Sequence, residues 1–211
     1  MEKQNTRKKE KEQGKYYKNK MAQAKRKQKF FDIDMPILKK ETQLYGYDLK
    51  EFDGKTIAYD LTRLLRGKAM ILKLKVKIEG DKATAEPREL KIMPYFIRRM
   101  MRKGTNYVED SFSAECKDAV LRIKPFLITR KKVSRAVRKA LREKAKEELI
   151  VYVKTMNIET LFDEIMKNQL QKFLSLKLKK IYPLSLCEIR FFAIEDNKES
   201  KKEQKTSMLS K

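Results

Sequence analysis

The segment 129–148, TRKKVSRAVRKALREKAKEE, contains the side chains of this sequence that are best suited to binding a polyanion. Nine of its twenty residues are Lys or Arg. At the helical spacing of about 100° per residue, the cations gather on one side and small apolar residues on the other, namely Val133, Ala136, Val137, Ala140 and Leu141. The cationic side comprises Arg135, Arg138, Lys139, Arg142 and Lys146, and Arg130, Lys131 and Lys132 lead into it. Because the fork of Arg fits two phosphate oxygens, the pattern indicates a helix that contacts nucleic acid.

Two other interpretations fit this segment less well. A solvated helix face usually mixes charges of both signs, whereas the acids here come only at the end, at Glu143, Glu147 and Glu148. A helix that lies on an acidic membrane usually presents Trp, Phe and Leu, whereas this apolar side consists mostly of Val and Ala. We therefore expect a nucleic-acid partner and no membrane partner.

The whole chain is strongly basic. Its 211 residues include 53 Lys or Arg against 29 Asp or Glu, which gives a formal net charge of +24. Such an excess repels itself unless a partner neutralises it, and nucleic acid is the commonest polyanion in cells. We favour folded or duplex RNA, because no helix-turn-helix, zinc-finger or basic-zipper pattern is present. No run of about 20 apolar residues is present either, so we expect a soluble, intracellular protein.

Few residues suit catalysis or metal binding. The chain has no histidine, the side chain used most often for proton transfer near neutral pH and for binding metals. Its two cysteines, Cys116 and Cys187, each lie within an apolar alternation, as small buried hydrophobes do. Glycine-rich phosphate loops and the H-E-x-x-H pattern are absent. We therefore expect no enzyme, no metal, no cofactor and no small-molecule substrate.

Composition divides the chain into a body and two tails. Residues 1–29 are rich in Lys and Arg and poor in aliphatic side chains, so we expect a disordered RNA-binding tail. Residues 195–211 mix Lys and acids without apolar periodicity and are expected to form a second disordered tail. Between them, residues 30–194 contain enough apolar side chains for a single α+β domain.

The first half of this body is predicted to be mainly β. Residues 72–78 alternate between apolar side chains and Lys73, Lys75 and Lys77, which is typical of a half-buried strand. The lysines can face solvent, where they would also block edge pairing, or RNA, and the pattern fits both. A strand over 56–59 is expected upstream, and Gly80–Asp81 is a turn signal before a strand over 83–93.

Two further elements complete this half. Residues 93–104 predict a short helix with Pro94 in its first turn, and its cations Arg98, Arg99, Arg102 and Lys103 are candidate RNA contacts. Next, 107–116 and 119–128 predict a hairpin that turns at 117–118. Pro125 indicates an edge or a bulge in the returning strand, because proline cannot donate a backbone hydrogen bond.

The second half is predicted to be mainly helical. Ser134 is a plausible N-cap for the basic helix, which should continue to about Thr155 and bury its last turns, LIVYV, nearly all round. One or two amphipathic helices follow over 158–181, Pro183 stops them, and 184–194 alternates well enough for a final strand.

Several segments together resemble one family, the S-three-a family of small-subunit ribosomal proteins of archaea and eukaryotes, called S-one-e in universal naming. KRKQKFFDIDMP (25–36) is similar to its basic-then-aromatic beginning, and GKTIAYDL (54–61) to its first core strand. Residues 105–149 resemble its hairpin and basic helix, and KKIYPLSLCEIR (179–190) its closing segment. The segments occur in the family's order. Residues 35–49, Gly67 and the long N-terminal tail depart from its pattern.

The resemblance implies an α+β fold with a mixed, barrel-like sheet packed with helices. It implies a structural constituent of the small ribosomal subunit, cytoplasmic, that binds ribosomal RNA and neighbouring platform proteins and supports assembly and translation. Where segments match, it implies RNA contacts at Arg26, Lys27 and Lys29 and over Arg130 to Arg142. The alternative is an RNA-binding or RNA-chaperone protein outside the ribosome.

Overall fold

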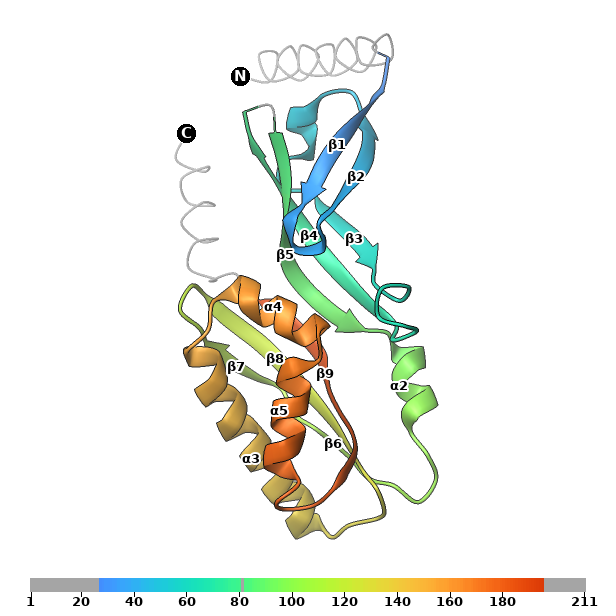
Figure 1. The fold of residues 1–211 in the computed structure, drawn as a ribbon, viewed down its shortest axis with the longest axis vertical. Coiled ribbons are helices and arrows are strands. Elements are labelled where there is room, and N and C mark those ends of the chain that lie inside the picture. The colour runs from blue at the N-terminus through green and yellow to red at the C-terminus, as the bar shows by residue number, and fades with distance from the viewer. Residues whose placement is uncertain (1–26, 81, 196–211) are drawn as a thin grey trace, which may run out of the picture. The chain divides into compact units, whose positions relative to one another are not determined.

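The computed structural model describes residues 27–80 and 82–195, which form a mixed β-sheet and several helices, as predicted for an α+β protein (Figure 1). The hydrogen-bonded path of described strands begins at β2 and ends at β6, so the sheet is not closed into a barrel. The described residues divide into two compact units. The first contains residues up to 55 together with 76–86, and the second contains 56–75 and those from 87 onward.

The first unit contains a hairpin of β1 (Lys29–Met35) and β2 (Lys40–Gly46), with a short 3₁₀ turn between them. Strand β1 also pairs in parallel with the beginning of β5 (Lys82–Ile92), at Asp34 and Thr84. The end of β4 (Met70–Glu79) belongs to this unit as well. A second 3₁₀ turn, Leu49–Phe52, contains Phe52, which is buried and meets Phe31 of β1 with ring centroids 5.8 Å apart.

The strands of the second unit pair mainly in antiparallel fashion. Strand β3 (Thr56–Asp60) pairs with the beginning of β4, and the end of β5 pairs with β9 (Leu184–Ile194). Strand β8 (Val120–Thr129) lies between β9 on one side and both β6 (Tyr107–Glu109) and β7 (Phe112–Glu115) on the other. The predicted hairpin is therefore confirmed, but its first arm is interrupted at 110–111. The bulge expected at Pro125 is present.

Helices pack against this part of the sheet (Figure 1). They are α3 (Arg135–Lys154), α4 (Ile158–Met166) and α5 (Gln169–Leu178). The short helix predicted after β5 is also present, as α2 (Pro94–Met100). Phe162 of α4 meets Phe192 of β9 edge to face, with ring centroids 5.0 Å apart. Such burial of large aromatic rings is the main source of stability in a core of this kind. None of the helices in the described ranges is long and apolar enough to cross a bilayer.

The buried side of α3 differs from the predicted one. Of the residues assigned to it, Leu141 is buried, Val137 and Ala140 are half-buried, and Ala136 is exposed. The buried row is Leu141, Ala145, Leu149 and Val153. Because an i+4 row turns by about 40° at each step, the side that meets the core at the end of the helix is not the side that meets it at the start. Val151, predicted to be buried within LIVYV, is 66% exposed, because it lies about 160° around the helix from the buried Leu149 and Val153.

The lysine row of β4 lies beside carboxylates of β5. Lys73 forms an ion pair with Glu89 at 2.9 Å, and Lys77 forms one with Glu86. Lys75 is half-buried. Strand β4 pairs with both β3 and β5, so its lysines do not protect a free edge. Two of the three cations are thus partly neutralised within the fold.

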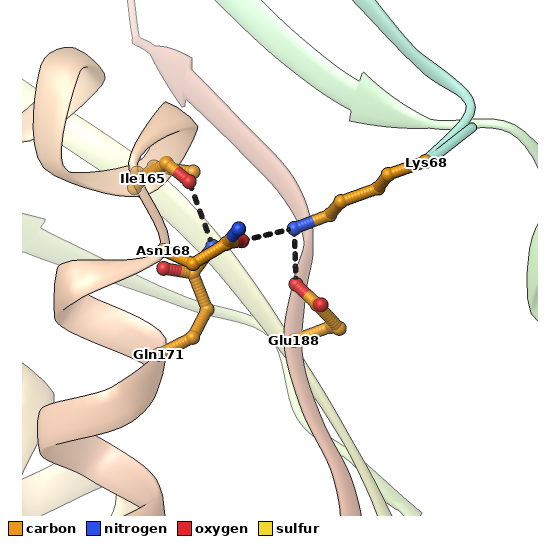
Figure 2. Close-up of polar contacts among 5 residues, drawn as sticks. All are labelled: Lys68, Ile165, Asn168, Gln171 and Glu188. Carbon is orange, nitrogen blue, oxygen red and sulfur yellow. Dashed lines mark hydrogen bonds and ion pairs between the residues drawn. The ribbon is translucent and has the colours of Figure 1, made fainter. Parts of the chain in front are cut away.

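One buried polar cluster joins elements that are distant in sequence (Figure 2). Lys68 is only 8% exposed, and its Nζ donates hydrogen bonds to Glu188 Oε2 at 2.5 Å and Asn168 Oδ1 at 2.7 Å. Asn168 adopts the left-handed backbone conformation before α5, with φ of 59°, which asparagine tolerates better than most residues. The cluster connects the segment before β4, the turn between α4 and α5, and β9.

Both cysteines are free thiols and half-buried. Burial, and then the neighbouring Glu188 carboxylate, raise the pKa of the Cys187 thiol to about 12. Cys187 is therefore protonated at neutral pH and lacks the thiolate that reactive cysteines need. The Sγ of Cys116 contacts the backbone of Ala119 in the turn between β7 and β8.

Candidate nucleic-acid interface

The basic segment before α3 is held by hydrogen bonds to its backbone. Thr129 is buried, its Oγ1 donates to the carbonyl oxygen of Lys131 at 2.7 Å, and its N–H donates to the carbonyl of Asn106. The side-chain Oδ1 of Asn106 in turn accepts the N–H of Val133 at 2.8 Å. These contacts fix the path of residues 130–132 while Arg130, Lys131 and Lys132 stay exposed.

The helix begins where the sequence predicted. Ser134 precedes α3 with an extended backbone, and its Oγ accepts the N–H of Val137 at 3.4 Å. The first N–H groups of a helix have no partner within it, and a Ser cap satisfies one of them. The cap thus fixes the start of α3 and with it the directions in which Arg135 and the following cations project.

Replacing Ser134 with Ala is expected to lower the free energy of unfolding by about 1 kcal/mol, because the Val137 N–H loses its acceptor. Urea unfolding followed by circular dichroism measures this change. Ser134→Asn serves as the control and should restore most of the loss, since asparagine caps helices as well as serine does. Equal stability of all three proteins would contradict the capping role.

The cationic residues of α3 and of the segment before it form a largely exposed surface, here called the α3 basic face. It comprises Arg130, Lys131, Lys132, Arg135, Arg138, Lys139, Arg142 and Lys146. Lys139 lies 3.7 Å from Glu143, and Lys146 lies over the Phe112 ring at 5.8 Å. Within the described part of the chain, Arg130, Arg135 and Arg142 form no ion pair. Their charge is therefore available to an external anion.

Arg138 differs from the other members of this face. It is half-buried, and its Nε is buried without a hydrogen-bond acceptor in the described structure. An unsatisfied buried donor costs roughly 1–3 kcal/mol. Arg138 therefore contributes partly to packing, and the exposed Arg130, Arg135 and Arg142 are the stronger candidates for phosphate contacts.

The remaining predicted contacts lie elsewhere. Lys27 and Lys29 are exposed in the first unit, whereas Arg26 lies outside the described residues, as do most of both predicted tails, 1–26 and 196–211. In the second unit α2 ends at Met100, earlier than predicted, and the predicted cations of its last turn and of the residues after it are exposed: Arg98, Arg99, Arg102 and Lys103. Arg99 lies over the Phe96 ring at 5.3 Å. That any of these residues binds RNA stays a prediction.

Sequence reasoning missed three cations that the fold places beside Arg142. Lys91 of β5, Lys124 of β8 and Arg190 of β9 line one pocket with it. The cations of these three strands are few and spaced apart in sequence, so no local cluster marked them. It also missed Phe30 and Tyr45, which contact each other across β1 and β2 with centroids 4.9 Å apart and are 68% and 57% exposed. Exposed aromatic pairs beside lysines can stack on unpaired bases.

The arrangement suits the binding of a polyanion. Arg and Lys side chains project from a helix whose start is capped. Among the described residues, no group of three or more Cys, Asp or Glu could hold a metal ion. These features define a basic α+β protein with an exposed cationic surface suited to a polyanion. Its sequence agrees with this class: a model of the ribosomal S3Ae family matches residues 18–197, and the chain belongs to that family.

Individual relatives are archaeal. The chain is 27% identical over 188 residues to the small ribosomal subunit protein eS1 of Nanoarchaeum equitans, a match that covers 85% of this chain and 94% of that protein. It is 30% identical over 133 residues to the protein of the same name from Pyrobaculum aerophilum, covering 62% and 60%. The protein of that name from Methanothermobacter thermautotrophicus is 29% identical over 122 residues, covering 56% and 63%.

Proposed function

We propose that this chain is a structural constituent of the small ribosomal subunit, in the cytoplasm, where it binds ribosomal RNA and supports subunit assembly and translation. The observation that carries the proposal is the α3 basic face, whose exposed arginines have no acidic partner among the described residues. Membership of the ribosomal S3Ae family supports it, as do relatives named small ribosomal subunit protein eS1. The proposed role is binding and assembly, without catalysis.

In this role the α3 basic face lies along phosphates of ribosomal RNA. Each Arg or Lys that pairs with a phosphate releases condensed counterions, and this release drives binding. The start of α3 is ordered before binding, because the Ser134 cap and the hydrogen bond from the Val133 N–H to Asn106 hold its backbone. This order limits the entropy lost on binding. The cations of α2, the segment Arg26 to Lys29 and the basic N-terminal tail are proposed as further RNA contacts. Neighbouring small-subunit proteins are the other proposed partners.

Sedimentation tests the proposal. The full-length chain, tagged and expressed in cells that make it, should run with small subunits in a sucrose gradient at physiological salt and leave them at high salt, because its contacts are largely electrostatic. Treatment with ribonuclease before the gradient should release it. A chain that stays at the top of the gradient at physiological salt would instead be an RNA-binding or RNA-chaperone protein outside the ribosome.

A further inference from the structure

The pocket that contains Arg142 has a composition unlike that of the rest of the α3 basic face. Its volume is about 720 Å³, within the range of about 300–1,000 Å³ typical of small-ligand sites. Cations come from three strands and from α3, an aromatic ring comes from Phe191, and a carboxylate and a hydroxyl come from the 110–111 segment. All of these residues belong to the second unit.

Two irregularities of the sheet, one on each side of β8, lie at residues that line this pocket. On one side of β8, the pairing with β7 ends at Ile123 and the pairing with β6 begins at Phe126, so Lys124 and Pro125 have no partner there. On the other side, the register with β9 steps from Lys124 and Phe191 to Pro125 and Ile189. A bulge of this kind lets consecutive side chains turn to one side of a sheet, and Arg190 and Phe191 both line the pocket.

The charges of the pocket are only partly satisfied. The Nη1 of Arg190 donates to both carboxylate oxygens of Glu109, at 3.1 Å each. The ammonium of Lys124 lies over the Phe191 ring, 4.8 Å from its centroid. Lys91 and Arg142 are exposed and form no ion pair with any described residue. The pocket therefore offers cations for an anion and a ring beneath one of them.

The pocket also offers hydrogen-bond acceptors. Asp110 Oδ1 accepts the backbone N–H of Ser111 at 2.8 Å, and Oδ2 has no hydrogen-bond partner among residues 27–80 and 82–195. A carboxylate among these cations disfavours a ligand that carries only negative charge, such as an acidic peptide. A nucleotide combines the required groups, because its phosphate is anionic, its base is a flat π-system, and its ribose hydroxyls and base amino groups donate hydrogen bonds.

We propose that this pocket receives one unstacked nucleotide of the RNA that the α3 basic face binds. Lys91 and Arg142 contact its phosphate, and Lys124 turns from the Phe191 ring to the same phosphate as the base takes its place over the ring. Asp110 and Ser111 then accept hydrogen bonds from the ribose or the base. Arg142 belongs to both the face and the pocket, so one strand can run from phosphate contacts on the helix into the pocket. This inference rests on the proposed function.

The test compares two RNA probes with the full-length chain. One is a short duplex with a single unpaired adenosine, and the other is the same duplex fully paired. We expect the wild-type chain to bind the bulged duplex about tenfold more tightly, because the unpaired nucleotide adds a phosphate contact to Lys91 and the stacking of its base on the Phe191 ring. Each of these contacts contributes roughly 1–3 kcal/mol. Lys91→Ala should remove most of this preference while changing affinity for the paired duplex little. Fluorescence anisotropy at fixed salt measures both affinities.

Lys172→Ala is the matched control, since Lys172 is an exposed lysine of α5 that does not line the pocket. It should lower the affinity for both probes equally and leave the preference intact. Equal binding of both probes by the wild-type chain would overturn the inference, and so would a Lys91→Ala variant that keeps the full preference. In a competition experiment, polyglutamate and adenosine monophosphate are each added to the complex with the bulged duplex. If polyglutamate displaces the duplex at a lower concentration than adenosine monophosphate does, the pocket is a site for acidic peptide and the inference is overturned. Sedimentation with small subunits would persist in these cases, so such failures are distinct from failure of the proposed function.

Discussion

Reversal of three exposed arginines, Arg130, Arg135 and Arg142, to Glu is expected to lower the affinity of the full-length chain for small-subunit RNA by at least about 100-fold at physiological salt. Each substitution removes a charged hydrogen bond to phosphate, worth roughly 1.5–3 kcal/mol, and adds repulsion. The salt dependence should change too. If each arginine neutralises one phosphate, the slope of log K against log salt becomes shallower by about 0.9 per contact.

The choice of these three residues follows from their surroundings. All are exposed and form no ion pair within the described ranges, so their reversal should leave the fold intact. Arg138 is left unchanged, because it is half-buried and its replacement could alter packing. Filter binding at several KCl concentrations gives the affinity and the slope. Circular dichroism and urea unfolding verify that the variant is folded.

A second triple variant separates local contacts from net charge. Lys172, Lys179 and Lys180 are exposed in α5 and directly after it, and their reversal to Glu changes the net charge by the same amount. This control should lose much less affinity than the α3 variant. Equal losses in both variants would show that RNA responds only to total charge. An unchanged affinity in the α3 variant would mean that the face is solvated surface.

Local features of this fold could be predicted because their causes lie within a few residues. The Ser134 cap, the alternation of β4 and the start of α2 at Pro94 each depend on neighbours in sequence, and each is present in the structure. In residues 107–128, one feature could be predicted from neighbouring residues and another could not. The turn between β7 and β8 was predictable, whereas the interruption at 110–111 depends on how β6 and β7 pair with different parts of β8.

Features that depend on distant pairing were not predictable in this way. The lysine row of β4 looked free in sequence, but Lys73 meets Glu89 and Lys77 meets Glu86 across the adjacent strand. The pocket cations come from four elements that only the sheet and α3 bring together. The buried side of α3 was misassigned because it was predicted from residues 133–141 alone, whereas the buried row continues to Val153 and turns around the helix. Each error comes from a contact that periodicity alone does not specify.

Lys68 is the clearest buried residue that sequence reasoning missed, and its loss should lower the stability of the fold strongly. We expect Lys68→Ala to lower the free energy of unfolding by about 3 kcal/mol, because removing one partner leaves Glu188 as an uncompensated charge at a largely buried site. The amide of Asn168 would also lose its donor. Urea unfolding at neutral pH measures the change.

A double variant separates the ion pair from packing. Lys68→Met retains much of the side-chain volume, and Glu188→Gln removes the partner's charge, so the combination should recover most of the stability lost in Lys68→Ala. Lys68→Met alone should remain destabilised, since it leaves the Glu188 carboxylate unpaired. The exposed Lys172→Ala should stay within about 0.5 kcal/mol of wild type. If Lys68→Ala is as stable as this control, the ion pair between Lys68 and Glu188 does not stabilise the fold as predicted. A recovery of stability in the double variant would show that Lys68 and Glu188 are energetically coupled. Most lysines of this chain can face solvent or RNA, whereas Lys68 would then stabilise the fold and take no part in RNA binding.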